Sequence, residues 1–242
     1  MNIISRENGL KLNIEKSETY RYLGYHFGGS VPLDPEIEKL VDELTLKVKE
    51  CVTPRCIYEI YDLKVRDSIC CLYPYETVDQ ARSLDPVLEI NSTKLANHIR
   101  ECRNAILFAA TMGPGTDILT KRFSGRSTIK PAVVQAAGAA AIEAFADEVT
   151  EQIRAEVSEL YSDKVTKTGD SLAINKDTSQ DCTGIRFKMR FSPGYGDFSL
   201  EHQKDFFNLL QLERNLGMSL NSALLMSPSK SITAVIGVLQ KK

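Results

Sequence analysis

The chain has 242 residues, 43% hydrophobic and 26% charged, which is the composition of a globular chain long enough to bury one sizeable core. Its formal net charge is −2 and its pI is about 6.0, so it has no general positive field and we expect no binding to nucleic acid. The N-terminus lacks the layout of a signal peptide, and no uncharged stretch reaches membrane-spanning length. We therefore expect a cytoplasmic chain with no membrane partner.

The helix predicted nearest the N-terminus begins at Asp34, because Asp34 suits the N-cap, Pro35 the first helical position and Glu36 the first turn. Apolar residues then recur at helical spacing as far as Val52, which indicates one buried face. Before this helix, residues 17–29 (SETYRYLGYHFGG) predict a short aromatic strand that ends in a flexible loop.

Residues 57–61 are interpreted as a strand or a short connection, and short β-strands are predicted at residues 69–73 and 87–90. Ser92 is expected to cap a short helix that runs to about Cys102. The six cysteines form no C-x-x-C pair and include the adjacent Cys70 and Cys71. We expect reduced thiols that serve as packing residues and no metal site.

The most apolar run, residues 103–113, predicts a central strand. The glycines in the Gly113-Pro114-Gly115 segment that follows either let a ligand approach the backbone or form a plain exit turn, and we favour the turn.

A long helix is predicted from Lys130-Pro131 over roughly thirty residues, which at 1.5 Å per residue gives a length of about 45 Å. Residues 136–141 (AAGAAA) carry little side-chain bulk, so this surface either receives a flat ligand or packs tightly against a sheet. Glu143 lies in this small apolar patch and needs a cation, which is either the ammonium of a ligand or a structural Arg or Lys.

After a polar segment at residues 166–182, expected to be a mobile loop, residues 184–190 alternate apolar and charged residues as a strand does. Residues 190–197 (RFSPGYGD) then predict a sharp bend, with Pro193 and Gly194 at the centre of a type II turn. Arg190 and Tyr195 flank this bend. The Arg190 guanidinium can donate two hydrogen bonds to a carboxylate, and the Tyr195 phenol can stack or donate a hydrogen bond.

The bend has two interpretations, a ligand-binding element or an ordinary strand-to-helix connection with a surface arginine. A helix is expected to follow from Ser199 to about Arg214, then a strand at residues 223–226, a turn at 227–229 and a strand at 232–239. Helices mixed with short, largely antiparallel strands predict the α+β class.

Four blocks together carry a family resemblance: residues 143–147 (EAFAD), 190–195 (RFSPGY), 216–222 (LGMSLNS) and 226–232 (MSPSKSI). In this order they resemble the activation domain of vitamin B12-dependent methionine synthase. The similarity is clear over roughly the last hundred residues and loose in the N-terminal half. The resemblance implies a single α+β domain over residues 1–242, with a mixed or antiparallel sheet, a long helix and several shorter helices, in which residues 1–30 form a loosely matched extension.

The resemblance also implies a function. Such a domain binds S-adenosylmethionine and supports the reductive methylation of cob(II)alamin held by a separate B12-dependent methionine synthase, with a flavodoxin or ferredoxin-type electron donor. The chain would be an accessory activation component that acts only in complex with its partner and has no catalytic residue of its own. The alternative function is a non-catalytic small-molecule-binding, scaffold or regulatory module of a corrinoid methyltransferase system.

By the same resemblance, each site residue has an expected role toward S-adenosylmethionine. Arg190 binds the ligand carboxylate and Glu143 the ammonium. Backbone groups of Ser192 and Gly194 hold the adenine or ribose. Tyr195 packs at the mouth that faces the corrin.

The sequence departs from the family pattern at several positions. Ala139 stands one turn before Glu143, where relatives have a carboxylate. Gly24 stands at the aspartate position of the Asp-x-His-x-x-Gly motif that cobalamin-binding proteins use, so His26 lacks its orienting carboxylate and we expect the cobalamin to arrive on the partner. Longer relatives continue beyond the last strand into a segment with ligand-contacting tyrosines, so we expect the site here to be either more open or completed by the partner.

Overall fold

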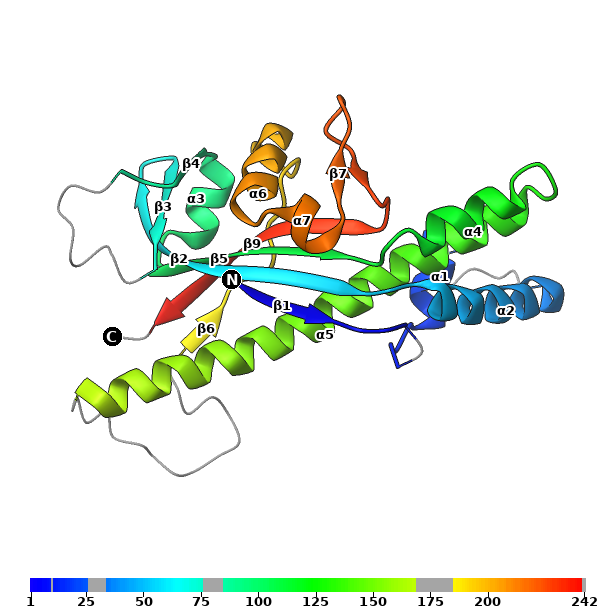
Figure 1. Cartoon of the computed structure of the whole chain (residues 1–242), viewed down its shortest axis with the longest axis horizontal. Helices are drawn as coiled ribbons and strands as arrows, with labels where there is room; N and C mark the ends of the chain where they lie inside the picture. Colours follow the sequence, from blue (N-terminus) through cyan, green and yellow to red (C-terminus); the bar gives the residue numbers. More distant parts are fainter. Residues whose placement is uncertain (10, 26–33, 76–84, 169–184, 241–242) are drawn as a thin grey trace. The chain divides into compact units, whose positions relative to one another are not determined.

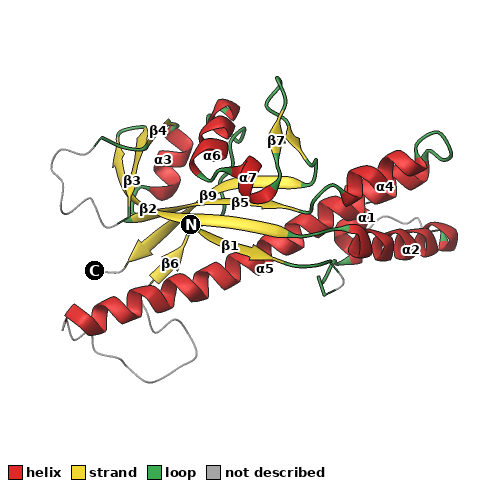
Figure 2. Cartoon of the chain, viewed as in Figure 1, coloured by secondary structure: helices red, strands yellow, loops and turns green. Residues whose placement is uncertain are grey.

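The structure is a computed structural model that describes residues 1–9, 11–25, 34–75, 85–168 and 185–240. Strands and helices both contribute extensively to the described chain (Figure 2), which confirms the α+β class. His26 and Cys182 lie outside the described residues, as does most of the segment predicted to be a mobile loop.

The main sheet has seven strands in the described residues, in the order β4-β3-β2-β5-β9-β6, with β1 paired to β2 outside this path. The pairs β1–β2, β2–β3, β3–β4 and β6–β9 are antiparallel, as expected. Two further strands, β7 (Ser219–Leu220) and β8 (Met226–Ser227), form a separate antiparallel pair. The seven strands of the main sheet are β1 (Asn2–Ser5), β2 (Arg55–Arg66), β3 (Ile69–Pro74), β4 (Leu88–Asn91), β5 (Asn104–Thr111), β6 (Ile185–Phe187) and β9 (Ser231–Gln240).

The chain divides into two compact units, each built from three segments. The first contains Met1–Tyr58, Ala109–Glu148 and Phe206–Thr233, and the second contains Glu59–Phe108, Val149–Asp205 and Ala234–Lys242. The boundaries fall inside β2, β5, β9 and two helices, α5 (Ile129–Thr168) and α6 (Gln203–Leu209). The single-domain organisation stays a prediction.

In the first unit, α2 (Pro35–Cys51) packs against α4 (Gly115–Phe123), and the two helices lie side by side in Figure 1. The carboxylate of Asp34 accepts the Glu36 N–H at 2.9 Å, which confirms the predicted cap. Helix α4 was not predicted. A Cβ on Gly115 would lie 1.9 Å from the Cys51 carbonyl oxygen, so this glycine allows the start of α4 to approach the end of α2. The segment at residues 113–115 is a turn into a helix.

In the second unit, α3 (Thr93–Ile99) packs against β3. The Ser92 hydroxyl accepts the Leu95 N–H at 3.1 Å, so the predicted cap is confirmed, although the helix ends three residues earlier than expected. Every residue of β5 is buried, as predicted for a central strand.

Helix α5 begins where Pro131 predicted and has 40 residues, so it runs into the segment expected to be a loop. By length and composition its stretch Ile129–Tyr161 could cross a membrane, but 56% of the most apolar window is buried in the structure. Core helices of globular chains pass the same test. Most of the small-residue run is buried and packs inside the unit. Its buried members are Ala136, Ala137, Gly138, Ala140 and Ala141.

Three local predictions were wrong. The aromatic segment forms a helix, α1 (Lys16–Tyr22), because Thr19 and Tyr20 are buried on one face and Gly24 ends the helix with a φ of +85°. The helix expected from Ser199 is divided into a 3-10 turn (Leu200–His202), α6 and α7 (Leu212–Leu216), with Gln211 at φ 48° between the last two. Of the strand predicted at residues 223–226, only Met226 is in a strand, β8.

The cysteines behave as predicted where the structure describes them. Cys56, Cys70, Cys71 and Cys102 are buried free thiols, and Cys51 is half-buried. Burial raises the pKa of Cys70 to about 12 and that of Cys102 to about 11, so both stay protonated at neutral pH.

Candidate functional site

The bend at residues 190–197 lies entirely in the second unit, after β6. Arg190 is half-buried, and its Nη1 donates to the Thr150 Oγ1 of α5 at 3.0 Å. Thr150 is 6% exposed, so its hydroxyl is held in place by the surrounding protein. This contact orients the guanidinium through one of its five N–H donors.

Phe191 anchors the start of the bend. Its backbone N–H donates to the Val235 carbonyl of β9 at 2.9 Å and its carbonyl accepts from Val235 at 2.8 Å. Its ring stacks on Phe198, at 6.3 Å between centroids, and meets the edge of Tyr195 at 5.9 Å. The ring of His98, from α3, also packs against the Phe191 ring, at 5.5 Å between centroids. The bend therefore has an aromatic base beneath it.

The predicted turn is present in the bend. The Tyr195 N–H donates to the Ser192 carbonyl at 3.1 Å, and Gly194 has the positive φ, +90°, that a type II turn needs at its third position. The Gly194 N–H donates to the Phe198 carbonyl at 2.7 Å. Tyr195 is 72% exposed, so the bend presents its phenol to solvent.

Glu143 lies in the first unit, on α5, at the wall of a pocket of about 480 Å³. That volume is in the range of small-molecule sites. Ala140, a mostly buried member of the small-residue run, and Ala144 flank Glu143 in the same wall. The charged residues of the lining are Lys11, Glu15, Glu18, Glu143, Asp147 and Glu148.

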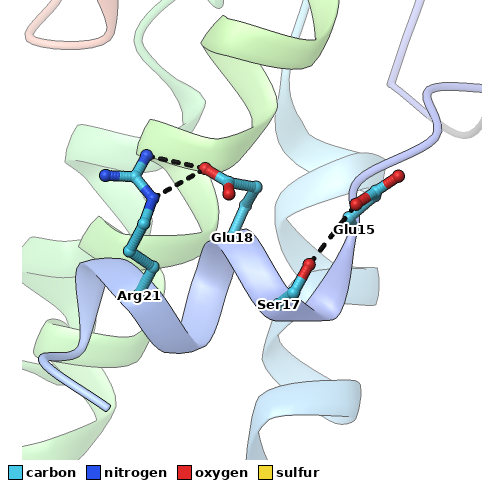
Figure 3. Close-up of polar contacts among 4 residues, drawn as sticks. All are labelled: Glu15, Ser17, Glu18 and Arg21. Atoms are coloured by element: carbon cyan, nitrogen blue, oxygen red, sulfur yellow. Dashed lines mark hydrogen bonds and ion pairs between the residues drawn. The ribbon is translucent and has the colours of Figure 1, made fainter. Parts of the chain in front are cut away.

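The pocket is acidic. Glu148 forms an ion pair with Arg6, and Glu18 forms one with Arg21 at 2.6 Å. Figure 3 shows Arg21 forking onto one oxygen of Glu18 along α1. These hydrogen bonds lower the pKa of Glu18, so it is ionised at neutral pH. Five of the described residues that line the pocket are acidic and one, Lys11, is basic, and an electronegative pocket favours a cationic ligand.

No group of three or more His, Cys, Asp or Glu side chains that could hold a metal ion occurs within the part of the chain that the structure describes. The chemistry of the two regions is thus that of a cation-attracting pocket and of an arginine beside a glycine-rich bend.

The comparison with known proteins decides the family. A family model described as the vitamin B12 dependent methionine synthase activation domain matches residues 90–241, which is more than half of the chain. The chain belongs to this family. No curated protein matches the chain in sequence.

The solved structures include one that shares the fold of this activation-domain chain, the crystal structure of the MetH reactivation domain bound to AdoHcy. Its TM-score is 0.66 at 17% sequence identity, and the match covers 98% of this chain and 78% of that one. At this identity the likeness concerns the fold, and it confirms the predicted activation-domain architecture.

Within this activation-domain chain, the sequence-predicted residues occupy two regions. Arg190, Ser192, Gly194 and Tyr195 lie together in the bend of the second unit, and Glu143 lies in the pocket of the first. Sequence reasoning missed the N-terminal residues that line this pocket. The Glu18–Arg21 spacing at i, i+3, which is typical of a helix face, was a signal that could have revealed α1.

Proposed function

We propose that the chain binds S-adenosylmethionine and supports the reductive methylation of cob(II)alamin on a separate B12-dependent methionine synthase. Membership of the activation-domain family supports this function, and so does the AdoHcy bound to the MetH reactivation domain of the same fold. The observation that carries the proposal is the oriented Arg190 guanidinium beside a turn that exposes Tyr195.

Arg190 would bind the ligand carboxylate. Its Nη1 is oriented by Thr150, and a guanidinium held in one orientation loses less entropy when it forks onto a carboxylate. Ser192 and Gly194 would hold the adenine or ribose. The Gly194 N–H already donates to the Phe198 carbonyl, so it is not the group that would bind the ligand. Gly194 would instead bind the ligand through its carbonyl oxygen, which can accept a hydrogen bond from an amino group.

Glu143 would bind the ligand ammonium. The acidic lining supports this role, since S-adenosylmethionine carries a sulfonium and an ammonium and both are attracted to carboxylates. Glu143 is half-buried, so its attraction for a cation is screened less than that of a surface glutamate.

The protein's contribution to the reaction is positioning. When bound on the partner, cobalamin supplies the cobalt that accepts the methyl group, and a flavodoxin or ferredoxin-type donor supplies the electron. This chain would hold the sulfonium methyl in line and turn an encounter of separate molecules into a step within one complex. Tyr195, exposed on the bend, would pack against the corrin face.

The test is a reactivation assay with a cognate synthase trapped as cob(II)alamin. The complete mixture contains this chain, S-adenosylmethionine and a low-potential reductant, and each component is omitted in turn. Reduction is uphill for ordinary donors, so cob(II)alamin absorbance should fall, and synthase activity return, only when all components are present. Calorimetric titration of the isolated chain with S-adenosylmethionine measures ligand binding separately from reactivation.

The outcomes separate the proposed function from its alternative. Conversion no faster than in the mixture without this chain would exclude the activation role. If the chain then still bound the synthase, the scaffold function would take its place.

A further inference from the structure

Asp197, the last residue of the bend, reaches the N-terminal turn of α3 within the same unit. Its Oδ1 accepts from the Ser92 Oγ at 2.6 Å, and its Oδ2 accepts from the Thr93 N–H at 2.9 Å. The Lys94 N–H also points to this carboxylate, 3.2 Å from Oδ1. We call this set of contacts the Asp197 clasp. It joins two segments that are about a hundred residues apart in the chain.

The clasp completes the cap of α3. Ser92 Oγ accepts the Leu95 N–H while its own proton goes to Asp197, so one hydroxyl serves both elements. The first amide groups of a helix have no partner inside the helix, and here a carboxylate from another segment supplies one. The hydrogen bond from the Ser92 hydroxyl lowers the pKa of Asp197 most, and the two backbone N–H groups lower it further. The Asp197 carboxylate is therefore ionised at neutral pH.

The backbone of the bend is shaped for this contact. Gly196 has a φ of +63°, and a Cβ there would lie 2.5 Å from the Cδ of Lys94. The positive φ favours glycine at this position, while the flexible Lys94 side chain could move aside for a Cβ. Tyr195 stands between two glycines with positive φ, and such a peptide holds a single conformation only when both its ends are fixed.

Both ends of the bend are fixed by different means. At the start, Phe191 exchanges two backbone hydrogen bonds with Val235 of β9. At the end, the Asp197 clasp ties the chain to α3, and the next residue, Phe198, is 1% exposed. Without the clasp, the end of the bend would lose the carboxylate that ties it to the start of α3.

We infer that Asp197 is a positioning residue that holds the bend in its ligand-binding conformation through Ser92 and the start of α3, without contacting the ligand. This inference rests on the proposed function, since the bend carries Arg190, Ser192, Gly194 and Tyr195. The alternative is that Asp197 only caps α3, in which case its loss would leave the bend unchanged.

The experiment compares wild type with Asp197→Ala, Asp197→Asn and the control Glu101→Ala. Glu101 is exposed beyond the other end of α3, so its variant removes the same charge without touching the bend. Each chain is titrated with S-adenosylmethionine, and amide hydrogen exchange is followed at Thr93, Lys94 and Gly194.

In Asp197→Ala we expect the affinity for S-adenosylmethionine to fall about tenfold, because the loss of one charge-assisted contact would release the bend that binds the ligand. Exchange at Thr93, Lys94 and Gly194 should accelerate. Asp197→Asn should recover part of the affinity, because its amide oxygen still accepts from Ser92, and Glu101→Ala should bind as wild type does. A residue with a purely structural role in α3 would not give this graded rescue of binding.

Wild-type affinity in Asp197→Ala, with exchange accelerated at Thr93 and Lys94, would show the inference to be wrong. If wild type binds no S-adenosylmethionine, the proposed function fails, and exchange at Gly194 then decides the inference alone: unchanged exchange overturns it and accelerated exchange supports it. Should Asp197→Ala not fold, Asp197→Asn and Ser92→Ala provide the same comparison.

Discussion

At the residue scale, Arg190 shows how a neutral partner prepares a charged group. The Thr150 hydroxyl accepts a hydrogen bond from Nη1 and orients the side chain, and this contact places no negative charge beside the guanidinium.

We expect Arg190→Ala to weaken S-adenosylmethionine binding roughly ten- to a hundredfold, since a hydrogen bond to a charged group contributes about 1.5–3 kcal/mol. Arg190→Lys should recover only part of this loss, because an ammonium lacks the planar fork. Thr150→Val, which removes the orienting hydroxyl and keeps the shape, should cause a smaller loss. Calorimetry measures all three. Unchanged affinity in a folded Arg190→Ala chain would remove Arg190 from the site.

Asp197 makes a second prediction at this scale, for the dependence of stability on pH. Its pKa in the folded chain is lowered below the ordinary value of 3.8. Its contribution is therefore fully present above about pH 4 and is lost as the pH falls through the lowered folded pKa. Thermal unfolding of wild type and Asp197→Asn should differ most near neutral pH, and the difference should shrink below pH 4. A constant difference down to pH 3 would contradict this linkage.

At the element scale, close approaches of backbone decide which helices can pack. The start of α4 lies against the end of α2 because Gly115 has no side chain. A Cβ there would meet backbone, which cannot move aside as the end of a flexible side chain can.

We expect Gly115→Ala to lower the free energy of unfolding by roughly 3 kcal/mol or more, at the upper end of overpacking effects. Gly138→Ala is the matched control. Its new Cβ would meet side chains of Thr116 and Lys230 at 3.0–3.1 Å, and alanine gains about 1 kcal/mol of helix propensity over glycine. Urea unfolding of both variants measures the difference. Equal effects would mean that the α2–α4 approach relaxes easily.

At the scale of the whole molecule, β2, β5, β9, α5 and α6 each continue through the boundary between the two compact units. Unfolding one unit alone would break the hydrogen-bond ladders of strands shared with the other. We therefore expect one cooperative thermal transition, with coincident far-UV and near-UV circular dichroism midpoints. Two separate transitions would show that the units fold independently.

We also expect the isolated chain to retain no cobalamin on purification, because Gly24 replaces the aspartate that would orient a histidine ligand. The measurement is the visible absorption of the purified chain after incubation with cobalamin and gel filtration, with the cognate synthase as the positive control. A stoichiometric corrinoid on this chain would require a different mode of binding and would change the role assigned to the partner.

Much of the local structure followed from the sequence. Asp34 and Pro35 started α2, Ser92 capped α3, and the apolar run became the buried strand β5. Pro193 and Gly194 made the predicted turn. These features depend on hydrogen bonds and dihedral preferences within a few residues, so neighbouring residue types are sufficient to predict them.

The sequence by itself therefore determined the fold class, the turn that presents Tyr195, and the motif blocks that indicated the family. Only the tertiary structure decided that α1 lies beside an acidic pocket that α5 also lines, that Thr150 holds Arg190, and that Asp197 contacts the start of α3. Each of these arrangements joins residues that are distant in the sequence. Their geometry depends on how whole elements pack, because burial of Tyr20 on a helix face outweighs the strand preference of an aromatic segment.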